Sequence, residues 1–146
     1  DNLSKSPRRK ESNGIFFLHN YRDADNLYYT GIRVDGTAII KKKYNGIYYT
    51  LIETRISNEE YDRDTNPNLL PQNKWIGLRT ETRSTLKDHV EIKLFLDLED
   101  NDNWELFSVF VDDVEKTGTP VLSEGHAGIR TDFMDIKFKD YKLQKI

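Results

Sequence analysis

Hydrophobic and polar residues alternate along much of this chain with the period of two that is typical of β-strands. Runs of this kind cover residues 27–34, 37–44 and 47–54, and the turns between them are Asp35-Gly36 and Asn45-Gly46. Asp-Gly and Asn-Gly are strong short-range hairpin signals, because their backbones readily adopt the positive φ angles that tight hairpins need. The two turns in succession predict a three-stranded meander.

Further strands are predicted on both sides of this meander. A buried strand at residues 14–19 precedes it, and strands at 74–83, 89–97, 104–111 and 133–143 follow a long loop. In the last of these strands Ile136 and Phe138 alternate with Lys137 and Lys139, after a glycine-rich corner at residues 125–128. No segment shows convincing helical periodicity. About nine short strands predict an all-β fold, a two-sheet antiparallel sandwich of the jelly-roll type.

The alternation also assigns the two faces of each strand. Val90, Ile92, Leu94 and Leu96 point to one side and are expected in the core. If the neighbouring strands share a sheet, its outer face carries a set of charged and aromatic residues: Tyr29, Arg33, Trp75, Arg79, Glu81, His89, Glu91 and Lys93. Aromatic rings and hydrogen-bonding side chains suit a glycan, and arginine grips carboxylate or sulfate, so this face predicts a site for an acidic polysaccharide. A solvated face of cross-strand ion pairs is the alternative.

The lysine triplet Lys41-Lys42-Lys43 lies on one predicted strand. Successive residues of a strand point to opposite faces, so the three amines cannot form one basic patch. We expect them to protect an edge strand from pairing with another chain.

Composition narrows the class of protein. The 146 residues suit one domain, with residues 1–13 as a polar N-terminal segment or truncated edge and residues 14–146 as a single jelly-roll domain. The net charge of −3 argues against general nucleic-acid binding. We expect no membrane span and find no signal peptide, and the absence of cysteine excludes disulfides and thiolate metal sites.

An acidic turn provides the candidate metal ligands. Asp97, Asp100 and Asp102, with Glu99 among them, offer the carboxylate oxygens that Ca²⁺ prefers. A structural Ca²⁺ could bind there, although no cofactor is required. The alternative is ordinary turn chemistry, in which Asp and Asn side chains bond to their own backbone.

The order of several motifs resembles a known superfamily. A hairpin at Asp35-Gly36 and a strand led by Trp75 come first, and a strand ending in Val111-Asp112-Asp113 follows. Then come Gly125-His126-Ala127-Gly128-Ile129-Arg130-Thr131 and Phe133-Met134-Asp135-Ile136. This series resembles the concanavalin A-like superfamily of jelly rolls, in its laminin-G-like and glycosidase-associated branches. The chain departs from that pattern at Asp113, where the family usually has glycine. It also lacks the one or two strands that usually precede the equivalent of Ile15, or compresses them into residues 1–12.

The resemblance implies an extracellular or cell-surface domain that binds or cleaves sugars. We expect a carbohydrate-binding domain, and whether it is also an enzyme stays open. A polysaccharide lyase is one alternative, because residues 79–83 (Arg-Thr-Glu-Thr-Arg) resemble a uronate-binding strand of some superfamily lyases. A glycosidase with Glu81 and Glu91 as its carboxyl pair is another. The third is an adhesion or assembly domain, in which a neighbouring domain or chain completes the sheet.

Overall fold

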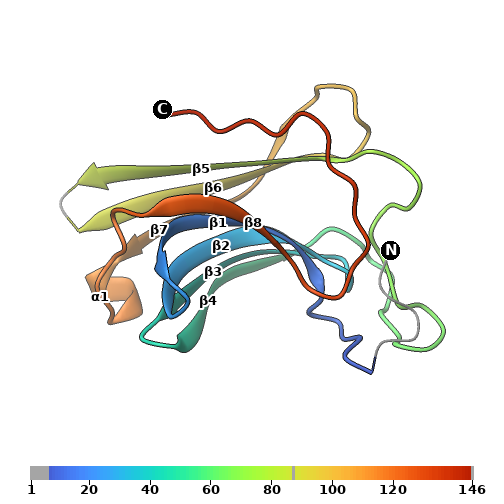
Figure 1. Ribbon diagram of the computed structural model, residues 1–146, viewed down its shortest axis with the longest axis horizontal. Helices are drawn as coiled ribbons and strands as arrows, with labels where there is room; N and C mark the ends of the chain where they lie inside the picture. Colours follow the sequence, from blue (N-terminus) through green and yellow to red (C-terminus); the bar gives the residue numbers. More distant parts are fainter. Residues whose placement is uncertain (1–6, 87, 146) are drawn as a thin grey trace.

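The computed structural model describes residues 7–86 and 88–145, which form two antiparallel sheets packed as a β-sandwich (Figure 1). The strand orders are β4-β3-β2-β1-β8 in the five-stranded sheet and β5-β6-β7 in the three-stranded sheet. The elements are β1 (Gly14–Asp23), β2 (Asn26–Arg33), β3 (Thr37–Tyr44), β4 (Ile47–Arg55), β5 (Gly77–Leu86), β6 (His89–Asp97), β7 (Glu105–Asp113), α1 (Val114–Thr117) and β8 (His126–Thr131). The predicted all-β class, with two antiparallel sheets, is confirmed.

The predicted meander is strands β2, β3 and β4. At its second turn Asn45 and Gly46 both have positive φ angles, of 48° and 79°, as the sequence predicts. At its first turn Gly36 has a φ of 74°, while the carboxylate of Asp35 accepts a hydrogen bond from the backbone N–H of Thr37 at 3.1 Å. Of the predicted polar segment, residues 1–6 lie outside the described part of the chain. Asn13 already joins the meander, since its carbonyl oxygen accepts from the backbone N–H of Val34 at 2.8 Å.

The core lies between the two sheets, where the alternation placed it. Val90, Ile92, Leu94 and Leu96 on β6 are buried, and they pack among side chains of the other sheet such as Tyr28 of β2 and Ile40 of β3. Each fully buried aliphatic side chain contributes about 1.5–3 kcal/mol relative to an exposed one.

The five-stranded sheet is arched, and the three-stranded sheet covers its convex side (Figure 1). Contacts across the gap connect β5 to β1 and β2, and connect β7 to β3 and β4. The concave side of the arch points away from the three-stranded sheet. In the described chain no helix has the length and apolar character needed to cross a membrane.

The predicted final strand is wrong in its position. The segment His126–Thr131, which overlaps the corner predicted at residues 125–128, forms β8 and pairs with β1, with Ile129 opposite Phe17. Residues 135–145 run on without regular secondary structure, although their hydrophobic residues alternate. Phe133 and Asp140 adopt φ angles of 51° and 54°, which interrupt an extended strand. The segment packs through side chains instead, with Tyr141 6.3 Å from the ring of Phe17.

Candidate functional site

Of the eight residues predicted on one face, seven are divided between the two sheets and one lies in a loop. Tyr29 and Arg33 belong to β2 of the five-stranded sheet. Arg79 and Glu81 are on β5, His89, Glu91 and Lys93 are on β6, and Trp75 lies in the loop before β5. The expectation of a single shared face is therefore wrong, because β2 bonds to β1 and β3 and has no ladder with β5.

Charges on the outer face of the three-stranded sheet largely satisfy one another. Glu81 lies opposite Lys93 and Arg83 lies opposite Glu91, and the Lys93 amine is 2.8 Å from the Glu91 carboxylate. The guanidinium of Arg79 lies 4.1 Å from the centre of the Phe95 ring. This face matches the alternative of a solvated ladder of ion pairs.

The three-stranded sheet also carries the residues on which the lyase and glycosidase alternatives depend. Residues 79–83 are part of β5, and the hydroxyls of Thr80 and Thr82 point inward to His19 in the core. Glu81 and Glu91 both belong to the ion-pair ladder, and neither faces the concave side of the arch. No contact in this part of the structure favours a lyase or a glycosidase.

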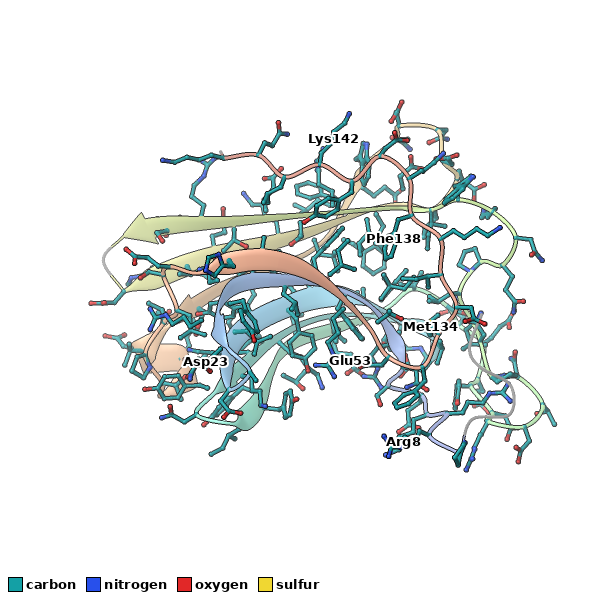
Figure 2. All side chains as sticks on the ribbon, in the orientation of Figure 1. Arg8, Asp23, Glu53, Met134, Phe138 and Lys142 are labelled. Atoms are coloured by element: carbon teal, nitrogen blue, oxygen red, sulfur yellow. The ribbon has the colours of Figure 1, made fainter. Side chains whose placement is uncertain are left out.

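The concave side of the five-stranded sheet has a different character. We call it the concave face and define it by residues whose registers place them on the same side: Phe16, Tyr29, Arg33, Ile39, Lys41, Tyr48, Glu53 and Arg130. Figure 2 shows Glu53 beneath the arch. Tyr29 and Arg33 are the two predicted site residues that it includes.

The floor of the concave face is apolar and aromatic. Phe16, Tyr29 and Ile39 are buried there, and the rings of Phe16 and Tyr29 meet edge to face with centres 5.6 Å apart. A Cβ atom on Gly31 would lie 2.8 Å from Cδ1 of Phe16, and one on Gly14 would lie 2.6 Å from its Cζ. These two glycines therefore leave room for the Phe16 ring to lie across β1 and β2.

Tyr48 adds an exposed ring above this floor. Its side chain is on β4, the residue is 52% exposed, and its ring meets that of Tyr29 edge to face at 6.2 Å. The amine of Lys43 lies 4.9 Å from the centre of the Tyr48 ring. An aromatic ring held in place on one side and open to solvent on the other can stack against a ligand.

Charged side chains surround the aromatic residues. Arg33 forms ion pairs with Asp35 at 2.6 Å and with Glu53 at 3.0 Å. Arg130 pairs with Asp132 at 3.0 Å, and its guanidinium lies 5.8 Å from the centre of the Tyr29 ring. The face thus combines rings with hydrogen-bonding and cationic groups.

Burial changes the ionisation of several groups on the concave face. Burial raises the pKa of the Tyr29 hydroxyl to about 12, so it is protonated at neutral pH. Burial lowers the pKa of the Lys41 amine, and the nearby charge of Arg33 lowers it further. Burial also lowers the pKa of Arg130, but its hydrogen bond and ion pair with Asp132 offset this, and the net direction is upward.

The predicted metal ligands serve mainly as turn residues. The carboxylate of Asp97 accepts hydrogen bonds from the backbone N–H groups of Glu99, Asn101 and Asp102 at 2.9–3.3 Å. Burial raises the pKa of Asp97, but these hydrogen bonds lower it more. Asp100 forms an ion pair with Lys139 at 2.9 Å. Within residues 7–86 and 88–145, no three acidic or histidine side chains form a group that could hold a metal ion.

Two hollows of the structure are lined by none of the residues that define the concave face, although Tyr21 of the first packs against its apolar floor. One of about 290 Å³ is lined by Tyr21, Arg22, Glu124, Gly125 and His126. Another, of about 230 Å³, lies against the acidic turn. The concave face is an open surface, which suits a long molecule lying across it better than a small one enclosed by it.

Lys41, Tyr48 and Arg130 were not among the predicted site residues. The position of Tyr48 could have been predicted from the Asn45-Gly46 turn. A two-residue hairpin turn there places residue 48 opposite residue 43, and the structure shows this pairing. Arg130 lies between the predicted corner and the predicted final strand, and Lys41 lies in a triplet interpreted as edge protection. That interpretation is wrong, because β3 lies between β2 and β4 inside its sheet.

Comparison of the chain with protein-family models, with curated proteins and with solved structures finds no match. The functional argument therefore rests on the residues of the concave face.

Proposed function

We propose that this chain is an extracellular carbohydrate-binding domain that holds a polysaccharide on the concave face, in a jelly roll of the concanavalin A-like kind. The observation that carries the proposal is the exposed Tyr48 ring seated on buried Tyr29, with Arg130 beside them. A sugar ring has an apolar side that stacks on an aromatic ring and an edge of hydroxyls that bond to charged side chains. The concave face supplies both kinds of group.

Replacing Tyr48 with alanine should weaken polysaccharide binding about fivefold or more, because it removes the exposed ring of the site. The measurement is affinity electrophoresis of the purified chain through gels that contain neutral or acidic polysaccharides. Trp75→Ala is the matched control, since Trp75 is 41% exposed but lies outside the concave face. Equal losses in the two variants, or no retardation of the wild-type chain in any gel, would contradict the proposal.

Assembly is a second candidate function, favoured by the side of the sandwich beside β5. In the described chain β5 bonds only to β6, so its other edge lacks a ladder partner. The nearby C-terminal segment exposes Phe138, Tyr141 and Leu143 (Figure 2 labels Phe138). An open edge flanked by exposed apolar side chains is the kind of surface to which another strand can pair.

If this side mediates assembly, the mass measured by light scattering should rise with protein concentration. Phe138→Ser should lower the measured mass toward that of the monomer at each concentration, because it removes an exposed apolar side chain from the pairing surface. Val109→Ser is the control, since Val109 is also exposed but lies on β7. A constant monomer mass over the whole range would exclude self-assembly through this edge.

A further inference from the structure

Two of the three cations that define the concave face have acidic partners. Arg33 pairs with Asp35 and Glu53, and Arg130 pairs with Asp132. At the end of the same side, Lys43 pairs with Asp25 at 3.0 Å. The Lys41 amine makes no hydrogen bond or ion pair with any residue in the described ranges. Nearby Glu53 and Asp35 raise the pKa of this amine and so partly offset its charge, but within the described ranges it has no direct acidic partner.

The surroundings of Lys41 make this charge costly. The side chain is partly buried, and burial is the main cause that lowers the pKa of its amine. The guanidinium of Arg33 lowers the same pKa, so two cations repel each other on this face. The Nε atom of Arg33 is itself buried and has no hydrogen-bond partner. Polar groups removed from water are normally hydrogen-bonded, so the Lys41 amine needs water or a ligand as its partner.

Lys41 also has a central position. It is on β3, directly opposite Tyr29 of β2 and opposite Thr50 of β4. A polymer stacked on Tyr48 and lying over the floor beside Tyr29 would come within reach of the Lys41 amine. An anionic group on that polymer would supply the partner that residues 7–86 and 88–145 do not provide.

We propose that the polysaccharide bound by the concave face is acidic, and that a carboxylate or sulfate group of the polymer binds the Lys41 amine beside Tyr29. The inference rests on the proposed glycan function and specifies its ligand class. The net charge of the chain is −3, so long-range attraction does not draw polyanions to it in general. Recognition of the acid depends on this local site.

The test compares Lys41→Met and Lys41→Arg with the wild-type chain in three gels. Polygalacturonate provides carboxylates, dextran sulfate provides sulfates, and dextran is neutral. Lys41→Met should lose about tenfold or more in affinity for whichever acidic polymer binds, because a charge-assisted hydrogen bond is lost. Lys41→Arg should restore most of the binding, and the polymer that responds identifies carboxylate or sulfate as the ligand group.

A matched control and a stability measurement separate this role from a structural one. Lys93→Met removes a lysine from the opposite face of the sandwich and should leave binding unchanged. The urea midpoint of Lys41→Met should equal or exceed that of the wild type, because an unpaired, partly buried charge has been removed. A lower midpoint would overturn the inference, since Lys41 would then support the fold.

The failure of this inference is distinguishable from the failure of the proposed function. If the chain binds dextran and the two acidic polymers equally well, and Lys41→Met leaves all three affinities unchanged, the proposed glycan binding stands and an acidic ligand group is excluded. If Lys41→Met and Lys93→Met weaken acidic binding equally, the attraction is general and Lys41 is not the site. If no polysaccharide retards the wild-type chain, both the inference and the proposed function fail.

Discussion

Replacing Asp112 with alanine is expected to lower the free energy of unfolding by about 3–5 kcal/mol. Asp112 and Lys42 are both fully buried between the sheets, with the Lys42 amine 2.7 Å from the carboxylate. Burial lowers the pKa of Lys42 while Asp112 raises it, and the net direction is downward. Removing Asp112 leaves the amine buried without its counter-charge, and this causes the loss of stability.

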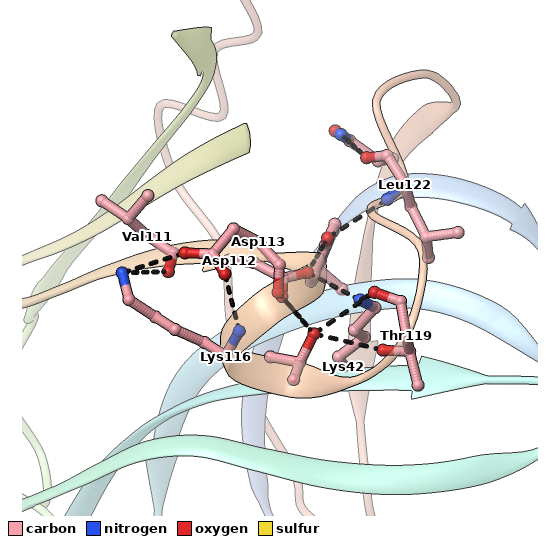
Figure 3. A network of polar contacts seen from close by, with 10 residues as sticks. Lys42, Val111, Asp112, Asp113, Lys116, Thr119 and Leu122 are labelled. Atoms are coloured by element: carbon pink, nitrogen blue, oxygen red, sulfur yellow. Dashed lines mark hydrogen bonds and ion pairs between the residues drawn. The ribbon is translucent and has the colours of Figure 1, made fainter. Parts of the chain in front are cut away.

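Other polar groups around this ion pair make its geometry specific (Figure 3). The hydroxyl of Tyr28 donates to the Asp112 carboxylate and accepts a hydrogen bond from the backbone N–H of Leu122 at 3.2 Å. Thr117 donates to the other carboxylate oxygen at 2.9 Å, and Lys42 donates to the carbonyl oxygen of Thr119 at 3.3 Å. Asp112 therefore connects β2 and β3 of one sheet to β7 of the other and to the segment that leads to β8.

Urea unfolding followed by fluorescence measures the effect, and two further variants define its cause. Asp113→Ala removes the N-cap of α1, where the carboxylate accepts from the backbone N–H of Lys116 at 2.6 Å, and an exposed ion pair with the Lys116 amine at 3.1 Å, so it should cost about 1 kcal/mol. The double variant Lys42→Met/Asp112→Leu should recover much of the loss, because no buried charge remains. Similar effects of Asp112→Ala and Asp113→Ala would show that the buried ion pair contributes little.

Local pattern was sufficient to predict most of the strands and the core side of β6. Period-two alternation placed Val90 to Leu96 in the core because one face of that strand packs against the other sheet. The same rule failed at residues 133–143, which alternate but form no regular strand. Alternation shows that a segment can form a strand, but pairing also requires a neighbouring strand and an uninterrupted extended backbone. The positive φ angles of Phe133 and Asp140 interrupt the backbone of this segment.

The candidate site depended on information that local pattern does not contain. The first hairpin pairs Arg33 with Thr37 across a three-residue loop, which places Lys41 opposite Tyr29. A two-residue turn at Asp35-Gly36 would have placed Lys42 there instead, and a shift of one residue exchanges the two faces of a strand. Lys41 and Lys42 therefore look alike in the sequence, although one lies on the concave face and the other is buried with Asp112.

Assignment of strands to sheets was the larger obstacle. The predicted site combined β2 with β5 and β6, which belong to different sheets. Nothing in the alternation of a strand identifies its partners, because the ladder between distant strands depends on how the whole chain folds. Tyr29 and Arg33 remained in the candidate site because they share one strand and one face.

Lowering the pH from about 6.5 to about 4 should cost the fold about 3 kcal/mol through His19 alone. His19 is buried on β1, and burial lowers its pKa from 6.5 to about 4. Its Nε2 lies 2.8 Å from the hydroxyl of Thr30 and 2.9 Å from that of Thr80, and its Nδ1 lies 3.0 Å from that of Thr82. These neutral hydroxyls suit the neutral ring, and they connect β1 and β2 to β5 across the core.

The direction of this pH dependence follows from the lowered pKa. Because the unfolded chain binds the proton more tightly, the contribution of neutral His19 is complete above pH 6.5 and is lost as the pH falls toward 4. Four carboxyl groups have pKa values lowered from 3.8: those of Asp23, Asp62, Asp97 and Asp113. Their protonation therefore changes the stability of the fold mainly below pH 4. A loss of stability between pH 6.5 and 4 therefore reports chiefly on the histidine.

Urea midpoints at several pH values between 7.5 and 4 measure the slope. His19→Gln should flatten it, because the amide stays neutral throughout and can still bond to the threonine hydroxyls. His126→Gln is the control, since His126 is exposed at the start of β8 and its replacement should leave the slope unchanged. If the His19→Gln chain loses stability as steeply as the wild type, protonation of His19 is not the cause of the acid sensitivity. If the slope disappears, a single buried imidazole makes the packing of the two sheets sensitive to pH.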